Sequence, residues 1–160
     1  MPDAVNAREI LRDPIHFLAF GFGSGLSPIA PGTMGTLAAI PLYYLLIQWG
    51  DWVYLLVTII VTLIGILICD ISSKKLGVHD HSGIVWDEIA GYFITMLFVP
   101  HTWYWVIAGF ALFRLFDIWK PFPILWFDQH IGGGLGIMLD DVLAAIYAGL
   151  ILLIMQLLLL

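Results

Sequence analysis

The sequence predicts an all-α fold, a polytopic bundle of about five membrane helices that forms a single membrane-embedded domain over residues 1–160. Of the 160 residues, 61% are hydrophobic and only 11% are charged, whereas soluble domains average about 25% charged residues. The apolar residues are collected in runs that approach the roughly 20 residues a helix needs to cross a bilayer. The formal net charge of −6 at pH 7 excludes a nucleic-acid partner, because that function requires a basic surface.

The N-terminal segment is not predicted to be a full membrane span. Residues 1–13 are polar, and we expect a short amphipathic or disordered lead-in. Residues 15–26 are apolar but few, and they carry Gly21, Gly23 and Gly25. This composition predicts a short interfacial or re-entrant segment.

The next segment, residues 27–36, combines two prolines with two glycines and leads into an apolar run. It predicts a loop that ends at a helix N-terminus, where free N–H groups and the positive end of the helix dipole can bind an anion. Gly32 and Thr33 are the candidate anion-binding residues. The alternative is a plain turn in which Thr33 caps the helix.

Two uncharged runs, residues 37–50 and 52–69, are separated only by Asp51. This pattern predicts a helical hairpin through the bilayer. The single cysteine, Cys69, has no partner for an internal disulfide, and we interpret it as a small packing residue.

A polar loop is predicted over residues 70–82. Its His79-Asp80-His81 sequence favours solvated histidines over a metal site, because alternate residues on a loop rarely supply a complete set of ligands. The acidic pair Asp87-Glu88 follows just inside an apolar run. On a helix these neighbours are about 100° apart and can flank one ion. Burying both acids costs free energy unless they are paired or bind a metal.

Residues 89–113 contain no Asp, Glu, Lys or Arg but are interrupted at residues 99–102. They could form one long kinked span or two shorter helices. The charge distribution favours a chain that folds back at Pro100-His101, with helices over about 83–99 and 102–120, because all six basic residues then face the cytoplasm. The fold-back also returns Asp87-Glu88 and the charged segment from Arg114 to Lys120 to the same face of the membrane.

The segment that begins at Arg114 carries most of the remaining charge. Arg114, Asp117 and Lys120 are spaced i, i+3 and i+6, so on a helix Asp117 lies between two cations. Pro121 predicts that this helix ends near Lys120.

The last segment begins with the glycine run 132–134, which can let the backbone approach a ligand closely. Asp140-Asp141 then opens the final apolar run. Residues 142–160 are predicted to form a terminal transmembrane helix.

Together these residues favour metal-assisted phosphoryl transfer. Carboxylates suit hard cations such as Mg²⁺, whereas Arg114 and Lys120 suit a phosphate monoester. A bound metal ion can polarise the phosphoryl oxygen. The candidate carboxylates are Asp80, Asp87, Glu88, Asp117, Asp140 and Asp141.

Four blocks of this sequence resemble phosphatidylglycerophosphatase A of bacteria: APGTMGT, HDHSGIVWDEIAG, FRLFDIWKPFPI and GGGLGIMLDDVLAA. The similarity extends from about Phe17 to the last helix. It implies a Mg²⁺-dependent, multi-pass enzyme of the bacterial inner membrane. The implied reaction removes the terminal phosphate of phosphatidylglycerophosphate and yields phosphatidylglycerol.

The residues and the resemblance together assign three roles. The catalytic candidates are Asp87, Glu88, Asp117, Asp140 and Asp141. The candidates for binding the substrate phosphate are Arg114, Lys120, Thr33 and Gly32, and the candidate metal ligands are Asp80, Asp87, Glu88, Asp140 and Asp141. We expect membrane lipids around the protein and no obligate protein partner.

Two functions from other classes remain open. A cation- or proton-coupled transporter would also place carboxylates near membrane helices, although it has no evident need for Arg114 and Lys120. A purely structural membrane protein is disfavoured because burying so many unpaired acids without a function is costly. An assay for release of phosphate from phosphatidylglycerophosphate distinguishes a phosphatase from these two alternatives.

Overall fold

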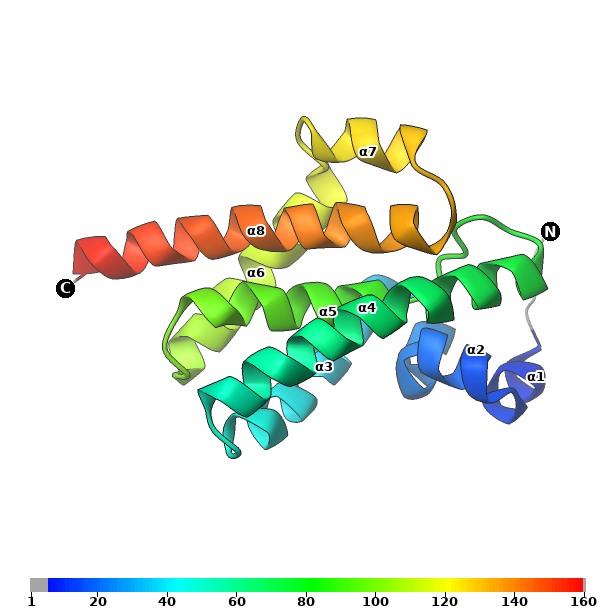
Figure 1. Cartoon of the computed structure of the whole chain (residues 1–160), viewed down its shortest axis with the longest axis horizontal. Helices are drawn as coiled ribbons and strands as arrows, with labels where there is room; N and C mark the ends of the chain where they lie inside the picture. The colour runs from blue at the N-terminus through cyan, green and yellow to red at the C-terminus, as the bar shows by residue number, and fades with distance from the viewer. Residues whose placement is uncertain (1–5, 160) are drawn as a thin grey trace.

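The computed structural model describes residues 6–159, and all the regular secondary structure in that range is helical (Figure 1). The elements in chain order are α1 (Ala7–Arg12), α2 (Pro14–Ala19), the 3₁₀ helix η1 (Gly21–Leu26), α3 (Pro31–Ile47), α4 (Asp51–Leu76), α5 (Trp86–Thr95), the 3₁₀ helix η2 (Met96–Phe98), α6 (Trp103–Trp119), α7 (Ile124–His130) and α8 (Gly133–Leu159). The all-α prediction is confirmed for this range. Residues 1–5 and 160, the beginning of the predicted lead-in and the last residue of the predicted terminal helix, lie outside the described residues.

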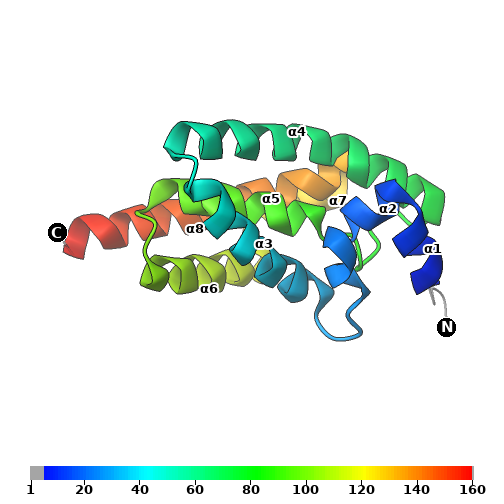
Figure 2. The same ribbon diagram turned by 90° about the horizontal axis from the view of Figure 1, so that it is seen from below.

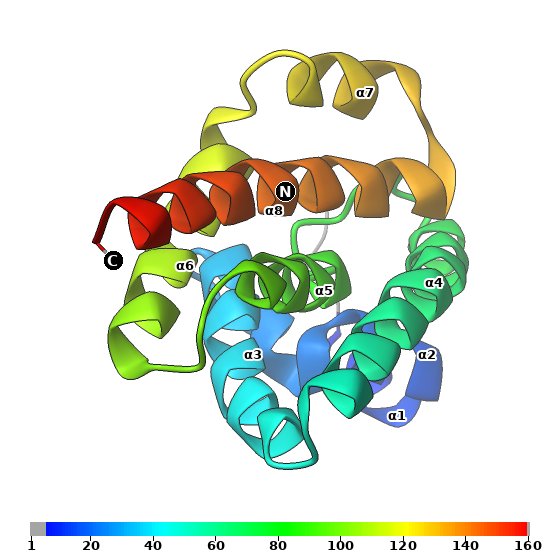
Figure 3. The ribbon, with the colours of Figure 1, turned by 60° about the vertical axis from the view of Figure 1, so that its left-hand side comes forward.

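Helix α5 occupies the centre of the bundle. Figure 3 shows it between α8 on one side and α3 and α4 on the other, and it contacts α6 as well. Eight of its ten residues are buried. Gly91 permits the close approach on the α6 side, because a Cβ atom there would lie 2.6 Å from the ring of Phe113. The core around α5 is mainly aromatic and includes Tyr43, Tyr54 and Tyr92.

The chain folds back between α5 and α6, as the charge distribution predicts. Helix α5 continues through η2 to Phe98, and α6 begins at Trp103 after an extended residue, Thr102. The alternative of one kinked span is wrong. Because α5 and α6 run in opposite directions (Figure 2), the start of α5 and the end of α6 meet at the same end of the molecule.

The predicted hairpin is present as α3 and α4, but its second helix is longer than expected. Helix α4 continues through Asp70 and ends at Leu76, so the polar loop is shorter than predicted. Gly77 ends α4 with a left-handed backbone, φ 69°. Lys74 and Asp70 form an ion pair of 2.6 Å one turn apart on the surface of this added part of the helix.

Helix α8 begins at Gly133, earlier than the predicted start at Val142. Its first N–H groups are satisfied by distant side chains, since Gly133 N donates to His79 Nε2 (2.9 Å) and Gly134 N donates to Asp70 Oδ1 (3.2 Å). A Cβ at Gly134 would lie 1.9 Å from the carbonyl oxygen of Ile66. The glycine run therefore lets α8 approach α4, and the predicted approach to a ligand is wrong at Gly134.

The N-terminal segment forms α1, α2 and η1 near the end of the molecule where α4 ends (Figure 2). His16 fixes α2 to α4 through a buried hydrogen bond between its Nδ1 and Ser72 Oγ, 2.8 Å. Asp13 begins α2 by accepting a hydrogen bond from Ile15 N (2.8 Å), and it also pairs with Lys75. The hydrogen bond from Lys75 lowers the pKa of Asp13.

Two of the described helices, α4 and α8, are long and apolar enough to cross a membrane, and only 28% of the most apolar 18-residue window of each is buried. A core helix of a soluble protein would be mostly buried, so these exposed apolar faces favour a lipid environment. Helix α3 is apolar but shorter, with 17 residues. The count of five membrane helices stays a prediction.

Candidate active site

A cavity of about 340 Å³ lies where the start of α5 meets the end of α6. It brings together segments that are far apart in the sequence, and nearly all of the predicted site residues line it. These are Gly32, Asp80, Asp87, Glu88, Arg114, Asp117, Lys120, Asp140 and Asp141. Thr33 is the one predicted site residue that does not line this cavity.

Five carboxylates in the cavity form two groups that share one member. Asp87, Glu88 and Asp141 each offer an oxygen within 4.8 Å of the others, and Asp117, Asp140 and Asp141 form a second such group. Asp141, which belongs to both, is only 2% exposed. Asp80 lines the cavity but belongs to neither group, whereas Asp117, one of the predicted catalytic residues, joins the second group.

The chemistry of these carboxylates fits a bound divalent cation. Within the described residues, four of their buried oxygens have no hydrogen-bond partner: Asp87 Oδ1, Glu88 Oε2, Asp140 Oδ1 and Asp141 Oδ2. Buried, unpaired and mutually repelling carboxylates are costly. A hard cation with oxygen ligands removes that cost.

The helices that carry these acids explain their placement. Asp87 and Glu88 lie in the first turn of α5, where the positive end of the helix dipole favours negative charge. Trp86 fixes this turn, because its indole N–H donates to the carbonyl oxygen of Val61 on α4 (3.0 Å). Asp140 and Asp141 lie within α8, in contrast to the predicted position at its start.

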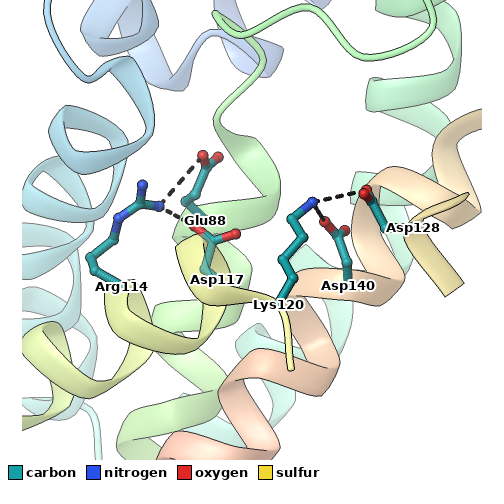
Figure 4. A network of polar contacts seen from close by, with 6 residues as sticks. All are labelled: Glu88, Arg114, Asp117, Lys120, Asp128 and Asp140. Atoms are coloured by element: carbon teal, nitrogen blue, oxygen red, sulfur yellow. Dashed lines mark hydrogen bonds and ion pairs between the residues drawn. The ribbon is translucent and has the colours of Figure 1, made fainter. Parts of the chain in front are cut away.

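Arg114 forms the positive wall of the cavity (Figure 4). Its Nη1 pairs with Asp117 one turn along α6 and lies 3.7 Å from Glu88 Oε1 on α5. Its Nε is buried and has no partner among the described residues. Carboxylates therefore hold the guanidinium through Nη1, while its Nη2 lies beside Gly32 at the start of α3.

Lys120 does not bracket Asp117 as its spacing predicts. Its Nζ contacts Asp140 Oδ2 (2.7 Å) and Asp128 Oδ1 (2.8 Å). The reason is local, because Lys120 lies just beyond α6 with a left-handed backbone, φ 47°, so the helical i+3 relation is lost. Burial tends to lower the pKa of Lys120, but the two carboxylates outweigh it and raise this pKa above its ordinary value. Lys120 is thus positively charged at neutral pH.

The N-terminus of α3 closes a third side of the cavity. Ala30 precedes it with a left-handed backbone, φ 47°, and no side chain caps the helix, so the capping role considered for Thr33 is not present. A Cβ at Gly32 would lie 2.2 Å from Glu88 Oε1 and 3.0 Å from Arg114 Nη2. Only glycine lets the start of α3 approach both charged groups.

The remaining polar candidates have structural roles. His79 caps α8, and His81 accepts a hydrogen bond from Gly83 N (3.0 Å). Cys69 is fully buried in the core, which agrees with the packing role.

Sequence reasoning missed several lining residues that flank the predicted ones: Ala30, Pro31, Ser82, Ile84 and Ile118. All five lie within the motif blocks, which was the signal that could have identified them.

Comparisons with known proteins identify the relatives of this chain. The family described as phosphatidylglycerophosphatase A matches residues 17–156. Phosphatidylglycerophosphatase A of Escherichia coli K12 is 50% identical over 151 residues, which cover 94% of this chain and 88% of that protein. The Haemophilus influenzae Rd protein of the same name is 49% identical over 148 residues, 91% of each chain. No solved structure matches the chain. With its family profile and these relatives in agreement over most of its length, the chain belongs to the phosphatidylglycerophosphatase A family and is a lipid phosphatase.

Proposed function

We propose that this enzyme removes the terminal phosphate of phosphatidylglycerophosphate and yields phosphatidylglycerol and inorganic phosphate. The supporting observation is one cavity in which two groups of buried carboxylates, joined by Asp141, face Arg114 and Lys120. The names of the E. coli and H. influenzae relatives support the choice of lipid. They give no support to the transporter alternative.

The cofactor that we infer is Mg²⁺. Asp87, Glu88 and Asp141 would hold it, or Asp117 and Asp140 with Asp141, because these are the carboxylates whose oxygens converge. When bound, Mg²⁺ stabilises negative charge on the phosphoryl oxygens as a Lewis acid. Asp80 lies outside both groups, so its assignment as a metal ligand has no support from the geometry.

The remaining groups of the cavity have distinct tasks in this proposal. Arg114 binds the phosphate through its guanidinium, and Asp117 holds the guanidinium in place. Lys120 and the uncapped N–H groups at the start of α3 bind further phosphate oxygens. These donors are fixed before the substrate arrives, so little free energy is spent on ordering them when the phosphate binds. A carboxylate oxygen that is not engaged by a cation accepts the proton of the attacking water.

The proposed location is the bacterial inner membrane, with α3, α4, α5, α6 and α8 in the bilayer and the cavity at the cytoplasmic face. The basic residues support this orientation, because Lys75 and Lys120 lie at the ends of α4 and α6, at the cavity end of the molecule. Helix α5 is too short to span a bilayer alone. It is packed on all sides by the other four helices, so its length does not have to match the hydrocarbon thickness.

The decisive experiment measures release of inorganic phosphate by the purified enzyme in mixed micelles. The expected result is turnover of phosphatidylglycerophosphate with Mg²⁺, at a kcat/KM well above that for phosphatidate, which carries a phosphate monoester on the same diacylglycerol anchor. The Asp141→Asn variant serves as the control for a contaminating phosphatase. Equal turnover of both lipids would reject the substrate assignment, and no phosphate release from either would reject the reaction.

A further inference from the structure

Lys120 is held by two acidic side chains from different helices. Figure 4 shows its ammonium between Asp140 of α8 (2.7 Å) and Asp128 of α7 (2.8 Å). Asp140 belongs to a carboxylate group of the cavity. Asp128 belongs to neither group, does not line the cavity and has no role in the reaction described above.

The two carboxylates fix the orientation of the Lys120 ammonium. A lysine ammonium has three N–H donors. Two are engaged by Asp128 and Asp140, so one remains. Because the three N–H bonds are tetrahedral about the nitrogen, fixing two of them fixes the direction of the third. With Asp140 as the only partner, the ammonium could rotate and the long side chain could change its rotamer.

Asp128 is itself held in place by the packing of α7. This seven-residue helix packs on α8, and its first residue, Ile124, is fully buried in the core. The segment before it is fastened by a hydrogen bond from Tyr147 Oη of α8 to the carbonyl oxygen of Phe122, 3.1 Å. Within α7, the ring of His130 stacks on Trp126 with a centroid distance of 4.5 Å. The carboxylate of Asp128 is thus presented to Lys120 by a fixed support.

We propose that Asp128 is a positioning residue that aims the remaining N–H group of Lys120 at the phosphate of the lipid substrate. This inference rests on the proposed function, because it takes the ligand of Lys120 to be a phosphate monoester. Asp128 touches neither the substrate nor the reacting atoms, and it acts only through Lys120. It follows that its contribution disappears when Lys120 is removed.

The test compares phosphate binding and turnover in variants of the full-length protein in micelles with saturating Mg²⁺. Two quantities are measured: the Kd of inorganic phosphate by titration calorimetry, and kcat and KM for phosphatidylglycerophosphate. Asp128→Ala is expected to raise both Kd and KM about tenfold, the loss of one charge-assisted hydrogen bond. The change in kcat is expected to stay within about twofold, because the same contact exists in the ground state and the transition state.

Two further variants separate positioning from support of the fold. Asp128→Glu keeps the charge and is expected to recover most of the affinity. Gln129→Ala, at the exposed neighbouring position of α7, is the matched control and is expected to leave Kd and KM unchanged. If Asp128→Ala fails to fold, Asp128→Asn replaces it, since the amide keeps the shape and an acceptor but lacks the charge, and a smaller rise in Kd is expected.

The deciding comparison is a double-mutant cycle with Lys120→Ala. In the Lys120→Ala background, Asp128→Ala is expected to have no further effect on the Kd of phosphate. An equal tenfold loss in both backgrounds would show that Asp128 acts without Lys120 and would overturn the inference. An unchanged Kd in the single Asp128→Ala variant would overturn it as well. Failure of the proposed function is distinguishable, because the wild-type enzyme would then release no phosphate from phosphatidylglycerophosphate while the Kd measurement still reports on Asp128.

Discussion

Arg114 and Glu88 form an ion pair in the wall of the cavity, with Nη1 and Oε1 3.7 Å apart, and each is only slightly exposed. They come from the end of α6 and the start of α5, so their approach depends on the turn between these helices. Gly32 fits into the same corner, where any side chain would collide with both groups. The pair therefore joins three helices at the point where the phosphate is proposed to bind.

A methyl group at Gly32 should disturb the contact between Glu88 and Arg114. We expect Gly32→Ala to lower kcat/KM at least about tenfold, because its Cβ would displace the carboxylate of Glu88 and the guanidinium of Arg114. Gly35→Ala is the matched control on the same helix, since its Cβ would meet Val85 in the core at 2.5 Å. It is expected to lower the thermal unfolding midpoint with a smaller effect on turnover. Wild-type kinetics of Gly32→Ala would contradict the assignment of this corner as the phosphate site.

Arg114 offers a test of geometry at constant charge. Arg114→Lys keeps the positive charge but loses the planar fork that contacts Asp117 and Glu88. We expect kcat/KM for phosphatidylglycerophosphate to fall at least about tenfold, measured as phosphate release, with no loss of expression. Lys74→Arg, which changes an exposed lysine remote from the cavity, should have no effect. If Arg114→Lys matches the wild type, Arg114 serves only as an ion-pair partner.

The carboxylate groups predict a link between the metal ion and stability. Chelation with EDTA is expected to abolish turnover and added Mg²⁺ to restore it. Because Mg²⁺ would bind the folded state and relieve repulsion among buried acids, it should raise the thermal unfolding midpoint of the wild type in a concentration-dependent manner.

Substitution of the shared acid should remove this response. Asp141→Asn is expected to be at least as stable as the wild type without metal, to show little stabilisation by Mg²⁺ and to have severely reduced kcat. Asp87→Asn, Glu88→Gln and Asp140→Asn are each expected to lower kcat as well. A Mg²⁺-dependent rise of the unfolding midpoint that persists in all four variants would place the metal elsewhere.

The sequence was sufficient to predict how the main helices are arranged and which residues gather at the cavity. Lengths of uncharged runs located the hairpin of α3 and α4, and the distribution of basic residues predicted the fold-back before α6. That fold-back is what brings Asp87 and Arg114 to one end of the molecule. These features follow from hydrophobicity and charge, which are properties of local sequence.

The features that were missed depend on contacts between distant residues. Helix α8 begins at Gly133 because Asp70 and His79, far away in the sequence, cap it. Lys120 meets Asp128 because its backbone leaves the helix with positive φ, which no spacing rule for a regular helix anticipates. Asp117 joins a carboxylate group and Asp80 does not. Both are aspartates, so the residue type alone could not predict this difference in side-chain position.

The orientation of the cavity in the membrane is the final prediction, tested by cysteine labelling of intact cells. Cys69 is fully buried, and Cys69→Ala gives a background without thiols. Gln48→Cys in the turn after α3 and His101→Cys before α6 lie at the end opposite the cavity, so an impermeant thiol reagent is expected to label them from the periplasm.

Positions at the cavity end provide the opposite half of this test. Gln129→Cys on α7 and Lys74→Cys near the end of α4 are both exposed, yet they should react only after the inner membrane is permeabilised. This pattern is expected because the end of the molecule that carries the cavity also carries the basic residues, which are retained on the cytoplasmic side. It also places the last residues of α8, at the opposite end in Figure 1, toward the periplasm. Labelling of Gln129→Cys but not of Gln48→Cys in intact cells would show the opposite orientation in the membrane, with phosphate released into the periplasm.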